Sequence, residues 1–408
     1  MVSHTLNIRL NLERYLAIFI VIFIFFTWRQ MTLIMLNNII EQTLINEVKL
    51  FLYGAYYIPV AVFIILSSIL FSKYKKLYIR LWLIPAIASC IIPTIFGFNF
   101  WSNVFYLLFA GLSVGFGVPI CLAFFADNTL IQNRGRIGAI IFFLTILSFA
   151  FFGIVADMIT AEEFTFVTFL WAFLSLVIFS FLRINYVNLK DISFKMVLTN
   201  KQFLFYFASW CMFCFVDLLE GPILRQYIIE TFEFNFLNFL RSIETVTAAF
   251  ATLLAGFLVD NYGRKKTLIY GFIILGIAYA TIGVFPLSEI SWYLYSIIYG
   301  IASGIFVVTF VFTIWGDLSQ KGVREKYYAL GSLPFFLIIF IQRLITPYIL
   351  EIPVHAAFSF ASFFLFLAVW PLVNAPETLP EKEIRRRELK KYVEKAKKLR
   401  EKYEKGED

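Results

Sequence analysis

Six charged residues lie inside long apolar stretches of this chain, where a charge is costly. They balance in sign, with three guanidinium and three carboxylate groups: Arg29, Asp217, Glu220, Arg241, Glu244 and Arg343. A charge at the centre of a membrane-spanning helix costs at least about 2.5 kcal/mol on insertion scales, so such residues usually serve a substrate or ion pathway. Carboxylates bind and release protons, and guanidinium groups hold anions. The set therefore predicts a site for protons and for a small polar or anionic solute.

The depths of these charges in their apolar runs agree. Four of the six charges lie sixteen or seventeen residues from a charged residue at the boundary of their own apolar run: Arg29, Asp217, Glu244 and Arg343. A helix rises about 1.5 Å per residue, so this distance corresponds to roughly 24 Å, just outside the middle of a bilayer. Charges at one height on four helices indicate a shared aqueous cavity.

Each charge in this set has a proposed task. We expect one carboxylate to be the proton site, with Asp217 the first candidate and Glu244 the second. Desolvation favours the protonated acid and a neighbouring arginine favours the carboxylate, so a bound substrate can release the proton by changing that balance. Arg29 and Arg343 are then candidate clamps for a carboxylate or phosphate, because guanidinium offers two fixed donors.

The same residues have a structural alternative. Asp217 and Glu220 are three residues apart, as are Arg241 and Glu244, so each pair shares one face of a helix. Such charges can lock helices together as ion pairs, or extend outward to the membrane surface, without binding a substrate. The spacing by itself leaves both interpretations open.

The elements that position these charges are predicted to be membrane-spanning helices. The chain is 61% hydrophobic and only 15% charged, whereas soluble domains carry about a quarter charged residues. Runs of about twenty apolar residues, enough to cross about 30 Å of hydrocarbon, occur near 14–36, 48–71, 79–98, 101–126, 137–158, 164–183, 202–222, 236–259, 267–286, 290–316, 327–350 and 353–374. These runs are too long and too continuously apolar for barrel strands, so we expect an all-α integral membrane protein with twelve helices.

Basic residues indicate the orientation of the chain. The N-terminus and the loops after even-numbered spans hold eighteen of them: Arg9, Arg14, Lys73, Lys75, Lys76, Arg80, Arg134, Arg136, Arg183, Lys190, Lys195, Lys201, Arg264, Lys265, Lys266, Lys321, Arg324 and Lys326. The opposite loops hold two, Lys49 and Arg225. Because Lys and Arg concentrate on the cytoplasmic side, we expect a multi-pass protein of the cell membrane with both termini in the cytoplasm.

The chain repeats itself at a shift of about 190 residues. In each half an aspartate ends a span and bases follow seven and nine residues later: Asp127, Arg134 and Arg136, then Asp317, Arg324 and Lys326. The predicted organisation is an N-terminal six-helix half (1–184), a cytoplasmic linker (185–200), a C-terminal six-helix half (201–375) and a charged cytoplasmic helical tail (376–408).

Three loops carry a resemblance to a known family. From Gly256 to Lys266 the chain reads GFLVDNYGRKK, which resembles the signature loop of the major facilitator superfamily, G-x-x-x-D-x-x-G-R-K/R. DNTLIQNRGR (127–136) and APETLPE (375–381) are similar to loops of its metabolite and sugar symporters. The resemblance covers about residues 12–380 and implies two six-helix halves that rock about one central site. It also implies that spans 1, 7, 8 and 11, which carry the six charges, line that site.

The resemblance further implies a cytoplasmic gate. In this superfamily, acids and bases at the inner helix ends pair across the two halves when the inside is closed. The candidates here are Asp260, Gly263, Arg264, Asp127, Arg134, Arg136, Asp317, Arg324 and Lys326. Gly263 permits a tight turn, and Asp260 is positioned to meet the positive N-terminal end of a helix in the other half. The alternative, that the bases merely set the topology, leaves the two equivalent aspartates unexplained.

The sequence predicts a secondary transporter and no enzyme. It has only His4 and His355, no metal-ligand spacing and no phosphate-binding loop, so we expect no catalytic residue, metal or cofactor. The favoured function is alternating-access transport of a small polar or anionic metabolite in symport with protons, by a monomer in the lipid bilayer that binds no nucleic acid. The alternatives are a proton-coupled efflux antiporter of an amphiphilic compound and a transport-inactive membrane sensor with the same fold.

Overall fold

The computed structural model describes residues 2–70, 79–182, 192–320 and 323–380, together with Leu389 and Val393, with side chains from Glu13 onward except that of Leu219. Every regular element within these residues is a helix. Twelve helical stretches among them are long and apolar enough to cross a membrane, so the prediction of an all-helical protein with twelve spans is confirmed. The helix predicted in the charged tail lies outside the described residues apart from Leu389 and Val393.

The first bundle holds six spans, which follow the apolar runs of the sequence. Its helices are α1 (Val2–Glu41), α2 (Asn46–Leu70), α4 (Leu83–Phe96), α5 (Phe100–Asn128), α6 (Arg134–Met158) and α7 (Ala161–Phe181), with a short turn, η1 (Ile131–Asn133), before α6. Local signals set the helix ends: Thr160 and Glu163 form a capping box that begins α7.

The second bundle repeats this plan. Its helices are α9 (Lys201–Thr231), α10 (Phe234–Tyr262), α11 (Arg264–Val284), α12 (Glu289–Phe306), α13 (Trp315–Asp317), α14 (Arg324–Ile349), α15 (Val354–Leu367) and α16 (Val369–Asn374). A π-helical segment, η2 (Val307–Ile314), joins α12 to α13 within one span.

Glycines set the closest helix contacts at equivalent places in the two bundles. A Cβ atom on Gly115 of α5 would lie 2.7 Å from the Val60 carbonyl oxygen of α2. At the equivalent place in the second bundle, a Cβ on Gly304 of α12 would lie 2.8 Å from the Thr252 backbone nitrogen of α10. Both helix pairs approach so closely that only glycine fits, and the internal repeat is therefore also a repeat of packing.

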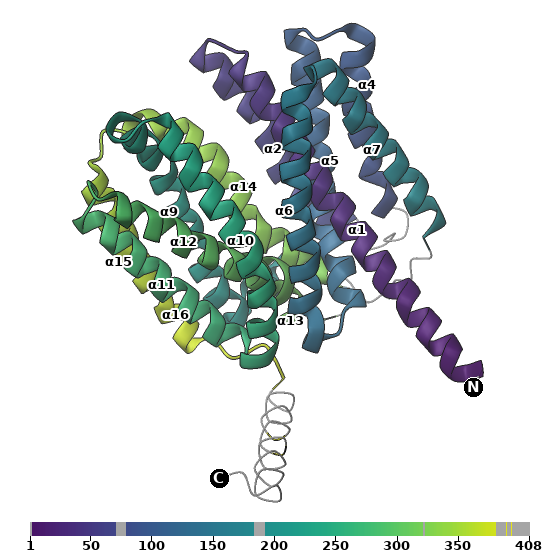
Figure 1. Cartoon of the computed structure of the whole chain (residues 1–408). Coiled ribbons are helices and arrows are strands. Elements are labelled where there is room, and N and C mark those ends of the chain that lie inside the picture. Colours follow the sequence, from purple (N-terminus) through teal and green to yellow (C-terminus); the bar gives the residue numbers. More distant parts are fainter. Residues whose placement is uncertain are drawn as a thin grey trace, which may run out of the picture.

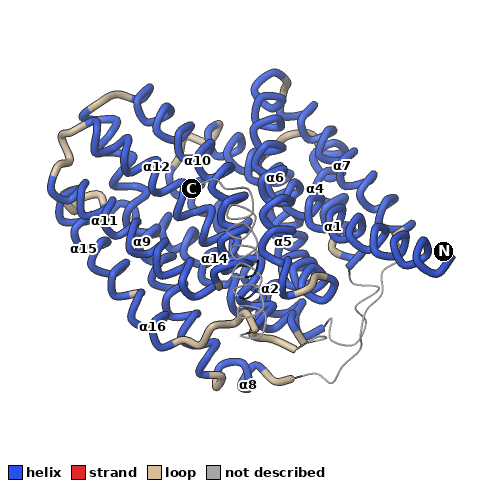
Figure 2. The backbone as a smooth tube through the Cα atoms, turned by 60° about the horizontal axis from the view of Figure 1, so that its bottom comes forward, coloured by secondary structure: helices blue, strands red, loops and turns tan. Residues whose placement is uncertain are grey.

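The two bundles converge at one end and diverge at the other (Figure 1). They touch mainly where α6 meets α10 and where α14 meets α2 and α5. We call the lower end in Figure 1, toward α13, the closed end, and the opposite end the open end. Figure 2, in which the closed end is turned forward, shows α8 (Phe194–Leu198) across this end, where it packs against α9 and α14.

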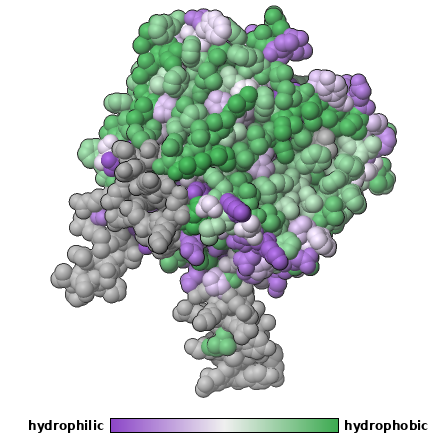
Figure 3. Space-filling view, turned by 180° about the vertical axis from the view of Figure 1, so that it is seen from behind, coloured by the Kyte–Doolittle hydropathy of each residue, from purple (hydrophilic) through white to green (hydrophobic). Residues whose placement is uncertain are grey.

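The outer surface is suited to lipid. A broad apolar band crosses the face seen in Figure 3, and hydrophilic residues gather toward its two ends. Large apolar side chains within the spans point outward, including Phe151, Phe250 and Trp370, each at least 60% exposed. In water such a surface would aggregate, whereas in a bilayer it meets acyl chains. The protein is therefore a multi-pass membrane protein.

The structure corrects one predicted boundary. The seventh span was expected to end at Pro222, but α9 continues through this proline to Thr231. Proline is tolerated inside membrane helices because neighbouring groups satisfy the freed carbonyl. The extra turns place Arg225 on a helix, whereas the sequence assigned it to a loop.

Candidate functional site

Buried ion pairs join the two bundles at the closed end. The Asp317 carboxylate accepts hydrogen bonds from the guanidinium groups of Arg134, in the first bundle, and Arg264, at 3.1 Å, in the second. All three side chains are at most 1% exposed. In the reverse direction, Arg324 of the second bundle pairs with Asp127 of the first at 3.2 Å. At the repeated positions, the base of each half thus pairs with the acid of the other.

Asp260 joins the bundles through backbone groups. Its carboxylate accepts hydrogen bonds from the backbone N–H groups of Gly135, at 3.0 Å, and Arg136, at 2.9 Å, at the start of α6. It also lies 3.3 Å from the Arg264 guanidinium and 3.9 Å from that of Arg136. This is the helix N-terminal contact that the sequence predicted for Asp260. Gly263, at φ +104°, makes the tight turn between α10 and α11, a conformation that favours glycine.

The segment after the last span adds a residue that the sequence analysis did not select. The Glu377 carboxylate accepts hydrogen bonds from the backbone N–H groups of Arg264, at 2.9 Å, and Lys265, at 3.1 Å, and so caps α11. The neighbouring Thr378 hydroxyl donates to Asp317 at 3.3 Å. The ammonium of Lys326, a predicted gate residue, donates to the Ile192 carbonyl and lies 5.4 Å from the Phe194 ring centre.

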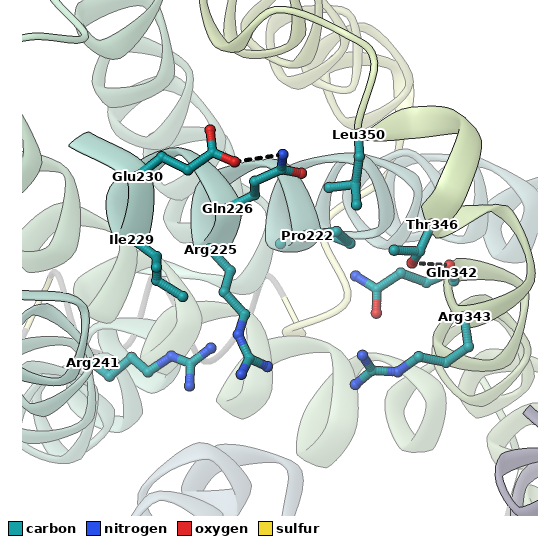
Figure 4. A pocket seen from close by; sticks show the side chains of 11 residues that line it. Pro222, Arg225, Gln226, Ile229, Glu230, Arg241, Gln342, Arg343, Thr346 and Leu350 are labelled. Atoms are coloured by element: carbon teal, nitrogen blue, oxygen red, sulfur yellow. Dashed lines mark hydrogen bonds between the residues drawn. The ribbon is translucent and has the colours of Figure 1, made fainter. Parts of the chain in front are cut away.

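Three arginines line a pocket at the open end. The pocket has a volume of about 560 Å³ and lies between α9, α10 and α14. The guanidinium groups of Arg225, Arg241 and Arg343 extend into the same space (Figure 4). Arg343 also lies 4.7 Å from the Tyr53 ring centre of the first bundle. Within the described part of the chain, none of the three forms an ion pair.

Arg29 lies in a second, smaller cavity between the bundles. This cavity has a volume of about 120 Å³ and is lined by α1, α5 and α6 on one side and by α9, η2, α13 and α14 on the other. The Arg29 guanidinium carbon lies 5.6 Å from the ring centres of both Phe335 and Phe336. It, too, has no ion-pair partner among the described residues.

The three acids form a separate row against α12. Asp217 accepts a hydrogen bond from the Tyr299 hydroxyl at 2.7 Å, and Glu220 accepts one from Tyr295. Glu244 accepts one from the Ser296 hydroxyl at 3.3 Å. None of the acids lines the two cavities, and Arg241 and Glu244 do not form the ion pair that their spacing allowed. The six predicted charges therefore separate into arginines that face cavities and acids that are held by hydroxyl groups.

This arrangement defines a class of protein. Two helical bundles share one packing plan, enclose a cavity between them and are joined at one end by ion pairs. Such an architecture belongs to membrane transporters that expose a central site to each side in turn. The protein is therefore a secondary transporter and not an enzyme.

The sequence model of the Major Facilitator Superfamily matches residues 202–403. The chain belongs to the major facilitator superfamily. No curated protein matches its sequence.

Solved transporter structures share the fold over most of the chain. The human organic anion transporter MFSD10 (TETRAN) is 16% identical, with a TM-score of 0.67 over 89% of this chain and 99% of that one. The Escherichia coli fucose:proton symporter FucP is 11% identical, with a TM-score of 0.72 over 89% of this chain and 98% of that one. A bacterial homologue of the iron transporter ferroportin, in an outward-facing state, is 13% identical, with a TM-score of 0.70 over 89% and 97%.

Proposed function

We propose that the protein moves a small anionic metabolite across the cell membrane by alternating access, in symport with protons. The observation that carries this proposal is the set of arginines on the cavity walls without an ion-pair partner among the described residues: Arg29, Arg225, Arg241 and Arg343. Positive groups in a cavity with low-dielectric walls raise the local concentration of anions and repel cations. Guanidinium groups also offer the paired donors that carboxylates and phosphates accept.

The acid row supports proton coupling. A fixed cation beside a carboxylate would hold it in the charged form, whereas a hydroxyl can donate to the carboxylate or accept from the protonated acid. Asp217, Glu220 and Glu244 each have a hydroxyl partner. Asp217 is the first candidate for the proton site because it is partly exposed, whereas Glu220 is only 6% exposed.

The two ends of the molecule support alternating access. We assign the closed end to the cytoplasmic side because its basic residues favour that side by the positive-inside rule, and in this assignment the structure has the form of an outward-open state. In this proposal, the pairs Arg134–Asp317 and Arg324–Asp127 hold the cytoplasmic side shut, together with the hydrogen bonds that Asp260 accepts from the start of α6. They break when the bundles rock to open that side.

The similar structures are compatible with this assignment but do not choose the substrate. Their titles include an organic anion transporter and a fucose:proton symporter, so this fold serves both anion transport and proton coupling. At such low identity they inform on the fold alone. The choice of an anion rests on this chain's own arginines.

The test is uptake of labelled anions into proteoliposomes with an inward proton gradient. We expect accumulation against a concentration gradient by the wild type and by Asp157→Asn, a matched change at an exposed position. In Asp217→Asn, we expect accumulation to be lost while exchange of labelled for unlabelled anion continues. Unchanged accumulation by Asp217→Asn would exclude Asp217 as the proton site. Uptake driven only by an outward proton gradient would favour the antiporter alternative.

A further inference from the structure

The small cavity beside Arg29 indicates what kind of anion fits. We infer that the substrate is a small aromatic carboxylate, with its carboxylate on Arg29 and its ring in the aromatic cavity between the bundles. This inference rests on the proposed function, because it specifies the anion. The inference uses the shape and chemistry of the aromatic cavity, whereas the proposed function uses the arginines alone.

The lining of the cavity is almost entirely apolar. Aromatic side chains come from both bundles, including Phe26 and Phe142 from the first and Trp210, Trp315 and Phe336 from the second. Arg29 is the one charged residue among the lining residues. Apolar walls with a few convergent polar groups are typical of sites that bind small organic molecules.

The size of the cavity limits the body of the substrate. Its volume of about 120 Å³ is close to that of the apolar cavities, about 150 Å³, that admit a benzene ring. A fused two-ring body exceeds this volume, and a two-carbon body leaves most of it unfilled. Edge and face contacts with Phe26, Trp210 and Trp315 would favour a planar ring over a branched chain of equal size.

The polar groups of the cavity suit one anionic head and little else. The Arg29 guanidinium can bind a carboxylate through two donors, and Ser332, which also lines the cavity, offers a hydroxyl. A sugar or a dicarboxylate would place further polar groups against phenylalanine and tryptophan rings, where they find no partner. Burying a polar group without a hydrogen bond is strongly unfavourable, so the cavity discriminates against both.

The open-end pocket supplies a path to this site. Arg225, Arg241 and Arg343 line the pocket, and the Arg343 guanidinium carbon also lies 4.7 Å from the Tyr53 ring centre of α2, in the bundle to which Arg29 belongs. An anion attracted by the three outer arginines can pass to Arg29, where its ring enters the aromatic cavity.

Another interpretation of the aromatic residues is a hydrophobic seal between the bundles. A seal requires that the rings fill the space between the bundles and carries no preference among ligands. The structure leaves ring-sized space there and places a guanidinium group without an ion-pair partner on its wall. The two interpretations differ in what the purified protein binds.

The experiment measures binding of tritiated benzoate to the purified full-length protein by scintillation proximity, with unlabelled competitors. We expect benzoate to bind at least about tenfold more tightly than acetate, which lacks the ring, and than benzyl alcohol, which lacks the charge. We expect 2-naphthoate, with two fused rings, and succinate, with two carboxylates, to compete more weakly than benzoate. This ligand series tests the inference on the wild type alone.

Two variants locate the site. Arg29→Gln is expected to weaken benzoate binding at least about tenfold, with partial retention in Arg29→Lys. Val311→Phe, which fills the cavity from η2, is expected to abolish benzoate binding. Its matched control is Val177→Phe, the same change at a 39% exposed position on α7, and it should bind as the wild type does.

The possible failures are distinguishable. Tighter binding of succinate than of benzoate, or equal binding of acetate and benzoate, would overturn the aromatic substrate and leave the anion transporter intact. Benzoate binding that Arg29→Gln and Val311→Phe leave unchanged would place the ring elsewhere and also overturn the inference. Binding of a neutral sugar with no competition by any anion would overturn the proposed function as well.

Discussion

Asp317 offers the sharpest test of the closed end. Its carboxylate is fully buried and bridges Arg134 of the first bundle and Arg264 of the second. Replacing it by asparagine keeps the size of the side chain but removes the negative charge. The two buried guanidinium groups then remain in the closed end with less compensation, and opening this end to water relieves that cost.

The size of the effect follows from the remaining contacts. Removing one partner of a buried ion pair costs about 3–5 kcal/mol. The lower end of this range applies here, because Arg264 keeps Asp260 at 3.3 Å and Arg134 keeps hydrogen bonds to Thr129 and to the Ala126 carbonyl. A cost of about 3 kcal/mol on the closed conformation alone shifts the equilibrium toward opening by about 100-fold.

The assay is a distance distribution between spin labels on the two bundles. Leu130 and Tyr262, each 53% exposed near the closed end, are suitable label sites in a chain freed of its four cysteines. We expect Asp317→Asn to convert a minor long-distance population into the major one, and Asp157→Asn, at the exposed end of α6, to leave the distribution unchanged. A distribution unaltered by Asp317→Asn would refute the role of these ion pairs in closing this end.

Three further predictions concern neighbouring features. Gly135→Ala should lower the melting temperature, because its Cβ would lie 2.8 Å from the Asp260 carboxylate and such overpacking costs about 1–3 kcal/mol. The control Gly153→Ala, with nothing within 4 Å of the added atom, should leave the melting temperature unchanged. Equal melting temperatures of the two variants would contradict the close packing of α6 on Asp260. Glu377→Gln should destabilise the start of α11 by about 0.3–1 kcal/mol, because a charge at a helix N-terminus is lost. This destabilisation is measured as faster hydrogen exchange of the first α11 amides. Unchanged exchange would show that the Glu377 cap does not stabilise α11. Arg241→Gln should slow anion uptake mainly at low ionic strength, because exposed charges act through screened attraction, and an effect equal at all salt concentrations would instead indicate direct coordination.

Much of the fold is predictable because the membrane constrains it. Apolar runs of sufficient length can only be helices, and the number of spans follows from them. The end of α9 was missed because the apolar run 202–222 stops at Pro222, whereas a membrane helix continues through such a proline, and so Arg225 was assigned to a loop. The π-helical segment from Val307 to Ile314 leaves no signal in a run where every residue is apolar.

The ion pairs of the closed end could be predicted because the chain repeats itself. Two aspartates with bases at equal spacing indicated the closed-end residues, and the structure shows that Arg134 and Arg324 each reach the aspartate of the other half. The hydroxyl partners on α12, such as Tyr299, were not predicted. Which side chain faces a buried acid depends on helix rotation, and an apolar span without a polar face does not reveal that rotation.

The central claim is that this transporter carries anions on its arginines. It is tested most directly by initial rates of uptake of labelled benzoate, succinate, phosphate and xylose into proteoliposomes containing the wild type or Arg29→Gln, with empty liposomes to correct for passive permeation. The account predicts protein-dependent uptake of at least one anion and none of xylose, with anion uptake lost in Arg29→Gln. Uptake of xylose without any protein-dependent anion flux, or anion uptake unchanged by Arg29→Gln, would contradict it.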